Sequence, residues 1–540
     1  MNGLNADWRM LRTTSALLLV CSFCLFLPSL YHELFADDEI YLAFSNRMVR
    51  QLPWTDLHLF LQKPANRWEF LPLRDFTYWL DFRLFGDEPM GFHFSSLAWY
   101  ALSAIAFFWL VRELVLLFRP AWANQAGVLA LCGTVLFVVH PAHVEAAAWV
   151  ASRKDLMAGA FGFLAAATLA RGLRAGWPVG NSLLAALLLL CACFSKAAGM
   201  TLVLFLTLLL AACWRHATTV PVGRKVASLL LPWAVVVVAA VVHMQMGEST
   251  GIRIENHPGT LIVLDRASRI FSTLGSLLLV PYPLGLYHDV YRLGEWHWLG
   301  SGLGLLLVLL ALRTLCVRRA LWPLGVVMAV APWLVYLQFL PFTTWSMASE
   351  RFLFVSVGGL VLVLVDILGR VGLPRRIIPL LLLLTVPMGV ITWMRMADWE
   401  LGGTLRTREY ERQPHFHNAI RDQVIYTLLP KRQYVEAESL AGTISRDYAA
   451  AALTAAVNAE RAFREREEGR VSEATDPHAD RAYCQEVASL HKSLTSGYTH
   501  IVRERDLSYN NLLRSIERQA EFRYADYPRI CDDSTATAAH

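Results

Sequence analysis

The sequence predicts an all-α polytopic membrane protein with about eleven membrane-spanning helices, followed by a soluble helical domain. Of its 540 residues, 55% are hydrophobic and only 17% are charged, whereas an ordinary soluble domain has about 25% charged residues. The apolar segments are concentrated between residues 13 and 394, and the rest of the chain is polar. This division predicts a membrane domain over residues 1–395 and a soluble α-helical tail over residues 396–540.

The predicted spans are long apolar segments separated by short polar ones. They cover roughly residues 13–30, 92–111, 123–140, 156–170, 182–194, 200–214, 226–244, 298–312, 321–340, 352–369 and 377–395. The first span follows two arginines, as a signal peptide would, but no small-residue cleavage site comes after it, so we interpret it as a retained helix. Residues 262–281 contain Arg266 and Arg269 and are predicted to form an interfacial or re-entrant segment.

The positions of the basic residues predict the orientation of these spans. If the N-terminus is cytoplasmic, the inner segments hold many Arg and Lys residues but only two acidic ones, Asp7 and Glu113. The positive-inside rule favours this orientation, which places the first loop, residues 31–91, and the tail outside the cytoplasm. The net charge of +5 therefore reflects membrane topology, and no nucleic acid partner is predicted.

Three adjacent acidic residues, Asp37, Asp38 and Glu39, directly follow the first span. A single acid at this place is usually a solvated loop residue or a helix cap. Three neighbouring carboxylates near hydrocarbon repel one another, and charge is costly there. They are therefore candidates for contact with a cation, a metal ion or a hydroxyl proton, and a carboxylate can act as a general base.

Other candidates lie in the remaining outer segments. Arg74 belongs to a loop stretch rich in aromatic residues, where an interfacial helix with snorkelling arginines is the alternative. The turn over residues 140–155 contributes His143, Glu145, Arg153 and Lys154. Its histidines and glutamate lack an established zinc spacing, so no metal site is predicted, and a divalent ion stays an open alternative as a cofactor. The basic pair suits a phosphate, or else a solvated helix end.

Lys196 interrupts two apolar runs and is the most informative single residue. A buried lysine without a partner is costly or loses its proton, so it needs a protein carboxylate or a phosphate. Glu350 and Arg351 are either an ion pair with each other or contacts to a substrate. Bases for a phosphate, acids for proton transfer and an aromatic groove together predict a lipid phosphate ligand embedded in the bilayer.

Several motifs, taken in order, resemble a known family. They are residues 72–86, 91–94, 140–149, 153–156, 194–196, 283–287 and 348–352. Together they resemble the transmembrane and tetratricopeptide-repeat glycosyltransferases of the GT-C superfamily, which are related to protein O-mannosyltransferases. The resemblance covers about residues 30–410. It implies inverting transfer of one sugar from a polyprenyl-phosphate donor to a hydroxyl of a secreted or pilus-type protein, or of an envelope glycan, outside the cytoplasm.

The same resemblance implies roles for individual residues. It places the catalytic or acceptor-binding carboxylate at Asp37 or Asp38. It also implies that four basic residues contact the phosphate of the carrier: Arg153, Lys154, Lys196 and Arg351. Family members often have Arg-Pro where this chain has Leu71-Pro72. The role of that arginine therefore passes to Arg67 or Arg74, or is absent.

The tail departs from the family pattern, because no 34-residue helical repeat is evident in it. We predict an α-helical tail, with a degenerate TPR-like array as the alternative. Cys484 and Cys531 could pair if the tail lies outside the cytoplasm. The competing functions are a lipid-linked glycan ligase or polymerase, and a non-catalytic scaffold or transporter. A bacterial inner (plasma) membrane with a periplasmic C-terminus is predicted, and the endoplasmic reticulum is the alternative.

Overall fold

The computed structural model describes residues 2–35, 46–65, 69–214, 217–249, 260–317, 320–339, 346–371, 374–471, 477–504, 510–524, 527 and 531. All regular elements within these ranges are helices. The chain forms two compact units, one covering most of the residues up to Gly402 and the other beginning at Gly403. The first unit thus extends slightly beyond the predicted domain end at residue 395.

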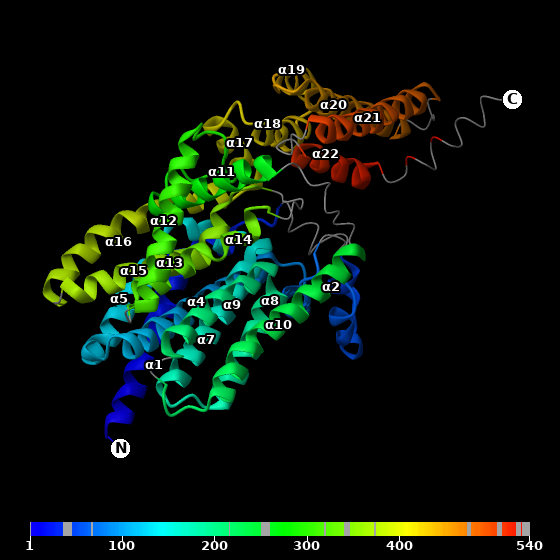
Figure 1. Ribbon diagram of the computed structural model, residues 1–540. Helices are drawn as coiled ribbons and strands as arrows, with labels where there is room; N and C mark the ends of the chain where they lie inside the picture. Colours follow the sequence, from blue (N-terminus) through cyan, green and yellow to red (C-terminus); the bar gives the residue numbers. More distant parts are fainter. Residues whose placement is uncertain are drawn as a thin grey trace. The chain divides into compact units, whose positions relative to one another are not determined.

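The first unit is built mainly of long apolar helices, shown in Figure 1. They are α1 (Asn2–Phe26), α2 (Arg47–Gln51), α3 (Pro72–Phe85), α4 (Pro89–Phe118), α5 (Ala126–Val138), α6 (Val144–Ala148), α7 (Arg153–Arg174), α8 (Val179–Ser195), α9 (Leu202–Trp214), α10 (Val222–Ser249), α11 (Thr260–Leu279), α12 (Trp296–Val317), α13 (Trp322–Val330), α14 (Trp333–Tyr336), α15 (Phe354–Val371) and α16 (Pro374–Met396). Short 3-10 segments join several of them, among them η5 (Pro141–His143), η6 (Val150–Ser152), η7 (Ala197–Thr201) and η8 (Glu350–Leu353).

Each predicted membrane span overlaps helical residues of this unit, and the one over residues 321–340 is divided between α13 and α14. Within the described residues, eight segments are long and apolar enough to cross a bilayer. They are Thr13–Tyr31, Pro89–Phe118, Pro120–Val138, Val150–Arg174, Ala197–Trp214, Val222–Met246, Trp296–Leu315 and Glu350–Arg370. Two further apolar helices, Val179–Ser195 and Trp322–Tyr336, are shorter. This pattern supports an integral membrane protein with eight candidate spans, where the sequence predicts about eleven.

Helix α11 is the element over the predicted interfacial segment. It is not among the candidate spans, and Arg269 in it pairs with Asp265 one turn earlier. The side chain of Arg266 is buried and donates to the amide oxygen of Gln338 at 3.0 Å. Arg269 is therefore in an ion pair and Arg266 in a hydrogen bond, both within the protein.

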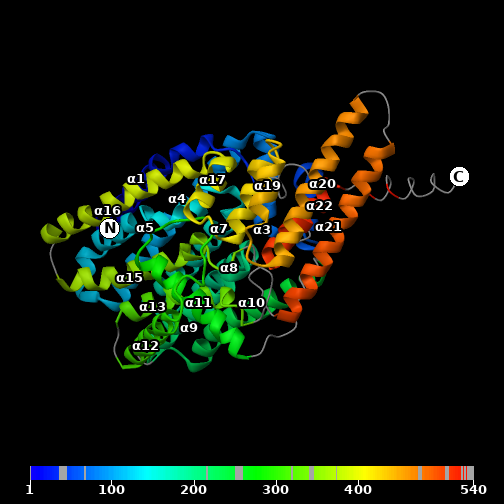
Figure 2. The same cartoon turned by 90° about the horizontal axis from the view of Figure 1, so that it is seen from above.

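Small residues allow the long helices to pack closely. Helix α7 packs against both α4 and α8, and α13 packs on α15 (Figure 1, Figure 2). A Cβ atom at Gly359 would lie 2.3 Å from the backbone nitrogen of Ala329, and one at Gly325 would lie 2.6 Å from the carbonyl oxygen of Gly359. Glycine is therefore required where the backbones of α13 and α15 meet, as is common between membrane helices.

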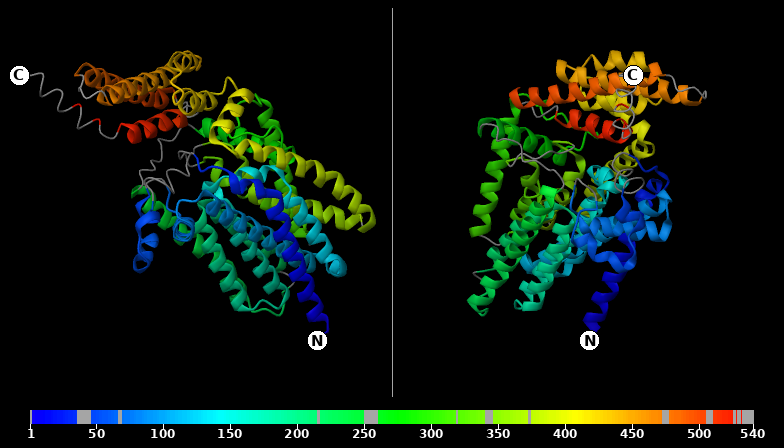
Figure 3. Two further views of the ribbon diagram at one scale, coloured as in Figure 1. Left: turned by 180° about the vertical axis from the view of Figure 1, so that it is seen from behind. Right: turned by 90° about the vertical axis from the view of Figure 1, so that its right-hand side faces the viewer.

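The second unit is a smaller helical domain with its own apolar core. Its elements are α17 (Gly402–Arg412), α18 (His417–Gln423), the π-helical turn η10 (Val424–Leu428), α19 (Tyr434–Ala441), α20 (Asp447–Val471), α21 (Pro477–Glu504) and α22 (Asn510–Arg523). The long helices α20 and α21 lie side by side (Figure 3). Helices α20 and α21 have 25 and 28 residues. Each is too long to be one of the two helices of a 34-residue repeat, whereas α19 has only 8 residues. The degenerate repeat array stays a prediction.

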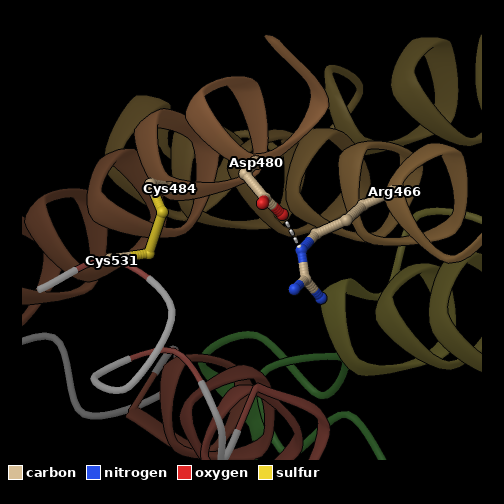
Figure 4. Close-up of a disulfide and its surroundings, with 4 residues drawn as sticks. All are labelled: Arg466, Asp480, Cys484 and Cys531. Atoms are coloured by element: carbon tan, nitrogen blue, oxygen red, sulfur yellow. Dashed lines mark hydrogen bonds and ion pairs between the residues drawn. A yellow bond between two sulfur atoms is a disulfide. The ribbon is translucent and has the colours of Figure 1, made fainter. Parts of the chain in front are cut away.

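One disulfide and one ion pair connect helices and segments of the second unit. Cys484 on α21 forms a disulfide with Cys531, and Arg466 on α20 pairs with Asp480 on α21 (Figure 4). Disulfides persist mainly in oxidising compartments. The bridge therefore agrees with the sequence-based expectation that Cys484 and Cys531 could pair if the tail lies outside the cytoplasm.

Candidate functional site

The predicted catalytic residues Asp37 and Asp38 lie outside the described residues, as do Glu39 and Arg67. Their roles stay predictions. The other candidate residues all lie in the first unit, and the structure shows the partners of each.

Arg74 and Lys154 share a carboxylate that the sequence reading missed, that of Glu69. Lys154 Nζ donates to both carboxylate oxygens of Glu69, at 2.7 and 2.9 Å, and the guanidinium of Arg74 also bonds to this group. Arg74 pairs in addition with its neighbour Asp75 at 2.7 Å. Burial acts to raise the pKa of Glu69, but the charges of Lys154 and Arg74 outweigh it and hold that pKa below its usual value. Glu69 is therefore an ionised carboxylate between two cations.

Pro72 explains why this cluster is positioned well. It starts α3, where a proline at the first turn loses no helical hydrogen bond. Arg74 and Asp75 thus stand on the first turn of a helix whose inner face is buried. Lys154 comes from the first turn of α7, so the cluster joins the first outer loop to the membrane helices.

Arg153 points away from this cluster and is completely buried. Its guanidinium pairs with Asp81 at 2.5 Å and donates to Ser96 Oγ at 3.1 Å, to Thr77 Oγ1 at 3.2 Å and to the carbonyl oxygen of Phe92 at 2.7 Å. These partners belong to α3 and α4. The geometry gives Arg153 a packing role that joins α3, α4 and α7, and its predicted contact with a carrier phosphate stays a prediction.

Lys196 lies in the break between α8 and η7, where its backbone is extended. Its ammonium group donates to Asp155 Oδ1 and lies 5.4 Å and 5.3 Å from the ring centroids of Tyr336 and Phe352. Of the two anions that the sequence allows for Lys196, the structure shows the protein carboxylate. The two rings stack on each other with centroids 3.7 Å apart, and we call this pair the aromatic platform. Because its distances to the two centroids are nearly equal, the ammonium group lies beside the edges of both rings.

Arg351 pairs with Glu145 of α6. Both the guanidinium and the backbone N–H of Arg351 donate to the Glu145 carboxylate, the latter at 2.8 Å. Burial raises the pKa of Glu145, although the charge of Arg351 opposes this rise. Glu350 accepts from the backbone N–H of Gly285 at 2.5 Å and lies 3.7 Å from Arg395. Of the two alternatives for Glu350 and Arg351, a pair limited to each other does not describe the structure, because each residue has a partner in another element.

His143 is a packing residue in this structure. Its ring lies 4.5 Å from that of Phe137 and 4.7 Å from that of Phe354, and Nδ1 is 3.2 Å from the hydroxyl of Tyr100. Burial lowers the pKa of His143 well below its usual value. Among the described residues, no group of three His, Cys, Asp or Glu side chains could hold a metal ion.

Lys196 and Arg351 line one pocket. Its empty volume is about 350 Å³ including the mouth, and it is lined by Asp155, Ala158, Lys196, Ala198, Gly199, Leu202, Pro332, Tyr336, Arg351, Phe352, Phe354 and Val355. Lys196 interacts electrostatically with Arg351 on one side and with Lys154 and Glu69 on the other. Three of the predicted phosphate-binding residues, Lys154, Lys196 and Arg351, thus converge from α7, the α8–η7 break and η8.

The residues that sequence reasoning missed are the partners and the platform. Asp155 directly follows the predicted basic pair, and Glu69 is the first acid before Arg74. Each could have been found by asking which carboxylates balance the outer bases. Tyr336 gives no such signal, because an aromatic residue in an apolar run is typical of any membrane helix.

Comparison with known proteins gives one distant relationship. A protein O-mannosyl-transferase of Caenorhabditis elegans is 28% identical to this chain over 96 residues, which cover 18% of this chain and 13% of that protein. The match therefore spans about one eighth of the relative's own length. No family model matches the chain, and no solved structure matches it.

Proposed function

We propose that this protein is a glycosyltransferase that works from the membrane. The partial match to a protein O-mannosyl-transferase supports transferase activity in general. The candidate spans support a membrane location. The observation that carries the proposal is a pocket lined by Lys196 and Arg351 beside an aromatic platform, with Lys154 near enough to Lys196 to interact with it electrostatically. Such a group of cations suits a ligand that carries a phosphate.

The proposed donor is a single sugar linked to a polyprenyl phosphate, with its lipid tail between the membrane helices. An acceptor hydroxyl oxygen attacks the anomeric carbon, the bond from that carbon to the phosphate oxygen breaks, and the polyprenyl phosphate leaves. Attack from the opposite side inverts the anomeric centre. The proton of the acceptor passes to a carboxylate, for which we propose Asp37 or Asp38. The cations stabilise the charge that develops on the departing phosphate.

The proposed acceptor is a hydroxyl of a secreted or pilus-type protein or of an envelope glycan. The reaction is proposed for the non-cytoplasmic face, with the second unit on the same side, in a bacterial inner membrane or in the endoplasmic reticulum. The positive-inside pattern supports this orientation. The Cys484–Cys531 disulfide supports an oxidising environment for the second unit.

A transfer assay tests the proposal. The full chain in lipid nanodiscs is given polyprenyl-phosphate mannose or glucose, with envelope extract from cells lacking the protein as the acceptor, and mass spectrometry identifies any glycosylated product. Transfer by the wild type, abolished in Asp37→Asn or Asp38→Asn and kept in Asp87→Asn, supports the proposal. Asp87 is a suitable control because its side chain is 68% exposed. Equal transfer by all variants would show that these acids are not catalytic, and no transfer with any donor would favour a scaffold.

A further inference from the structure

A residue of the wall of the pocket beside Lys196, Asp155, has a buried carboxylate oxygen without a hydrogen-bond partner among the described residues. Asp155 is only 5% exposed and lines the pocket. Its Oδ1 accepts from Lys196, whereas its Oδ2 has no hydrogen-bond partner among the described residues. A buried acceptor that lacks a partner is costly. Because this oxygen belongs to a residue of the pocket wall, a ligand that donates a hydrogen bond would remove the cost.

The electrical balance of the lining indicates what kind of group fits. Lys196 is paired with Asp155, and Arg351 is paired with Glu145. A phosphate inside the pocket would lie against the carboxylate of Asp155 and be repelled by it. A neutral hydroxyl group meets no such repulsion, since it can donate to Asp155 and accept from Lys196. Among the described residues Lys196 has one hydrogen-bond partner, although an ammonium group has three donors.

The rest of the wall suits a ring. Tyr336 and Phe352 stack with an interplanar angle of 7°, and the remaining lining residues, such as Leu202 and Pro332, are apolar. A sugar ring has a rim of hydroxyl groups and faces of C–H bonds that pack on aromatic rings. Ligand sites commonly combine such apolar walls with a few polar groups.

We propose that this pocket holds the sugar ring of the donor and that Asp155 determines sugar specificity by accepting a hydrogen bond from a sugar hydroxyl. This inference rests on the proposed function and deepens it. The phosphate then lies outside the pocket, toward Lys154, and Lys196 stands between the phosphate and the sugar. The pocket thereby reads the sugar, while the cations hold the phosphate common to all such donors.

The test compares a lipid phosphate that lacks a sugar with three lipid phosphoryl sugars. Citronellyl phosphate and citronellyl phosphoryl sugars (mannose, glucose and N-acetylglucosamine) are titrated into the full chain in nanodiscs, and Kd is measured by calorimetry. The ratio of the Kd of the bare phosphate to that of the best sugar ligand is the contribution of the sugar. We expect this ratio to be about tenfold or more in the wild type. It should fall toward one in Asp155→Ala, in which the bare phosphate binds equally well or more tightly.

A second pair of variants keeps the test decisive if Asp155→Ala does not fold. Tyr336→Leu removes a ring of the pocket wall and should lower the ratio, whereas Tyr426→Leu removes a ring in the second unit that is 37% exposed and should keep the ratio. An unchanged ratio in both Asp155→Ala and Tyr336→Leu would overturn the proposal. A wild-type ratio near one, with the bare phosphate still bound, would also overturn it and leave the proposed function standing. If the wild type binds neither ligand, the polyprenyl-phosphate donor itself is wrong.

Discussion

Arg351 donates to the carboxylate of Glu145 through both its guanidinium and its backbone N–H, although the two residues are 206 positions apart. The pair joins α6 to η8 and fixes one wall of the pocket. Glu145 is fully buried and the side chain of Arg351 is 8% exposed. A pair this deeply buried has few alternatives if one member is lost.

Glu145→Gln is therefore expected to destabilise the protein by about 3–5 kcal/mol, because it leaves the Arg351 charge buried without its carboxylate. The measurement is the midpoint of thermal unfolding of the purified protein in detergent. Glu295→Gln is the matched control, since the side chain of Glu295 is 85% exposed. Similar midpoints for both variants would show that Glu145 contributes no more than a surface acid.

The effect of Lys196 on phosphate binding is a separate prediction. Lys196→Ala should weaken the binding of citronellyl phosphate by about tenfold or more, because a charge-assisted hydrogen bond is lost. Lys431 in the second unit is exposed, so Lys431→Ala should leave Kd unchanged. Calorimetric titration of both variants checks this. If Lys196→Ala binds as tightly as the wild type, Lys196 serves only as the partner of Asp155.

His140 makes stability depend on pH. Burial lowers its pKa from 6.5 to about 4, so the unfolded chain binds this proton more readily than the folded protein. Stability is then complete above about pH 7.5 and falls as pH drops below 6.5, by about 1.4 kcal/mol at pH 5.5. Unfolding midpoints of the wild type and His140→Asn at pH 7.5 and at pH 5.5 check the direction of this change in stability. The variant should lose part of the difference, and an equal difference in both would exclude His140 as its source.

The disulfide of the second unit gives a prediction about both chemistry and stability. In the full chain, Cys484 and Cys531 should resist alkylation until a reductant is added. Cys21 and Cys24 are unpaired and lie in the apolar candidate span Thr13–Tyr31, so they should react in the denatured protein without a reductant. Mass spectrometry of the alkylated peptides distinguishes the two pairs. The bridge spans 47 residues, so the double variant Cys484→Ser/Cys531→Ser should lose about 4 kcal/mol in the chain-entropy description. Immediate alkylation of Cys484 would contradict the bridge.

The helical architecture could be predicted from the sequence because its signal is strong. Apolar runs such as residues 92–111 have too few charges to form anything but a buried or membrane helix. The number of spans was harder to predict. The apolar helix Val179–Ser195 has the right composition but is shorter than the candidate spans, and length alone does not determine whether it crosses.

The candidate site could be predicted only in part. Lys196 can be identified as a candidate from the sequence, because a charge between two apolar runs needs a partner. Its partner depends on how α7 and α8 pack, so the sequence alone does not show whether Lys196 pairs with Asp155 or with a bound phosphate. For the same reason, Glu350 and Arg351 read as a pair although the chain turns them toward different elements. The acids at 37 and 38 lie outside the described residues, so the structure leaves their roles as predictions.

Arg153 offers the sharpest test between a structural and a ligand-binding role. Its contacts with Asp81, Ser96 and Thr77 are all internal, so Arg153→Lys and Asp81→Asn should each destabilise the protein by about 3 kcal/mol or more. The two changes disrupt one network, so the double variant should cost much less than the sum of the single variants, with a coupling of about 1–3 kcal/mol. Unfolding midpoints give the cycle, and calorimetry gives the affinity for citronellyl phosphate in the folded fraction. Arg153 would be assigned a ligand-binding role if the losses of stability were additive and phosphate binding were weaker in Arg153→Lys alone.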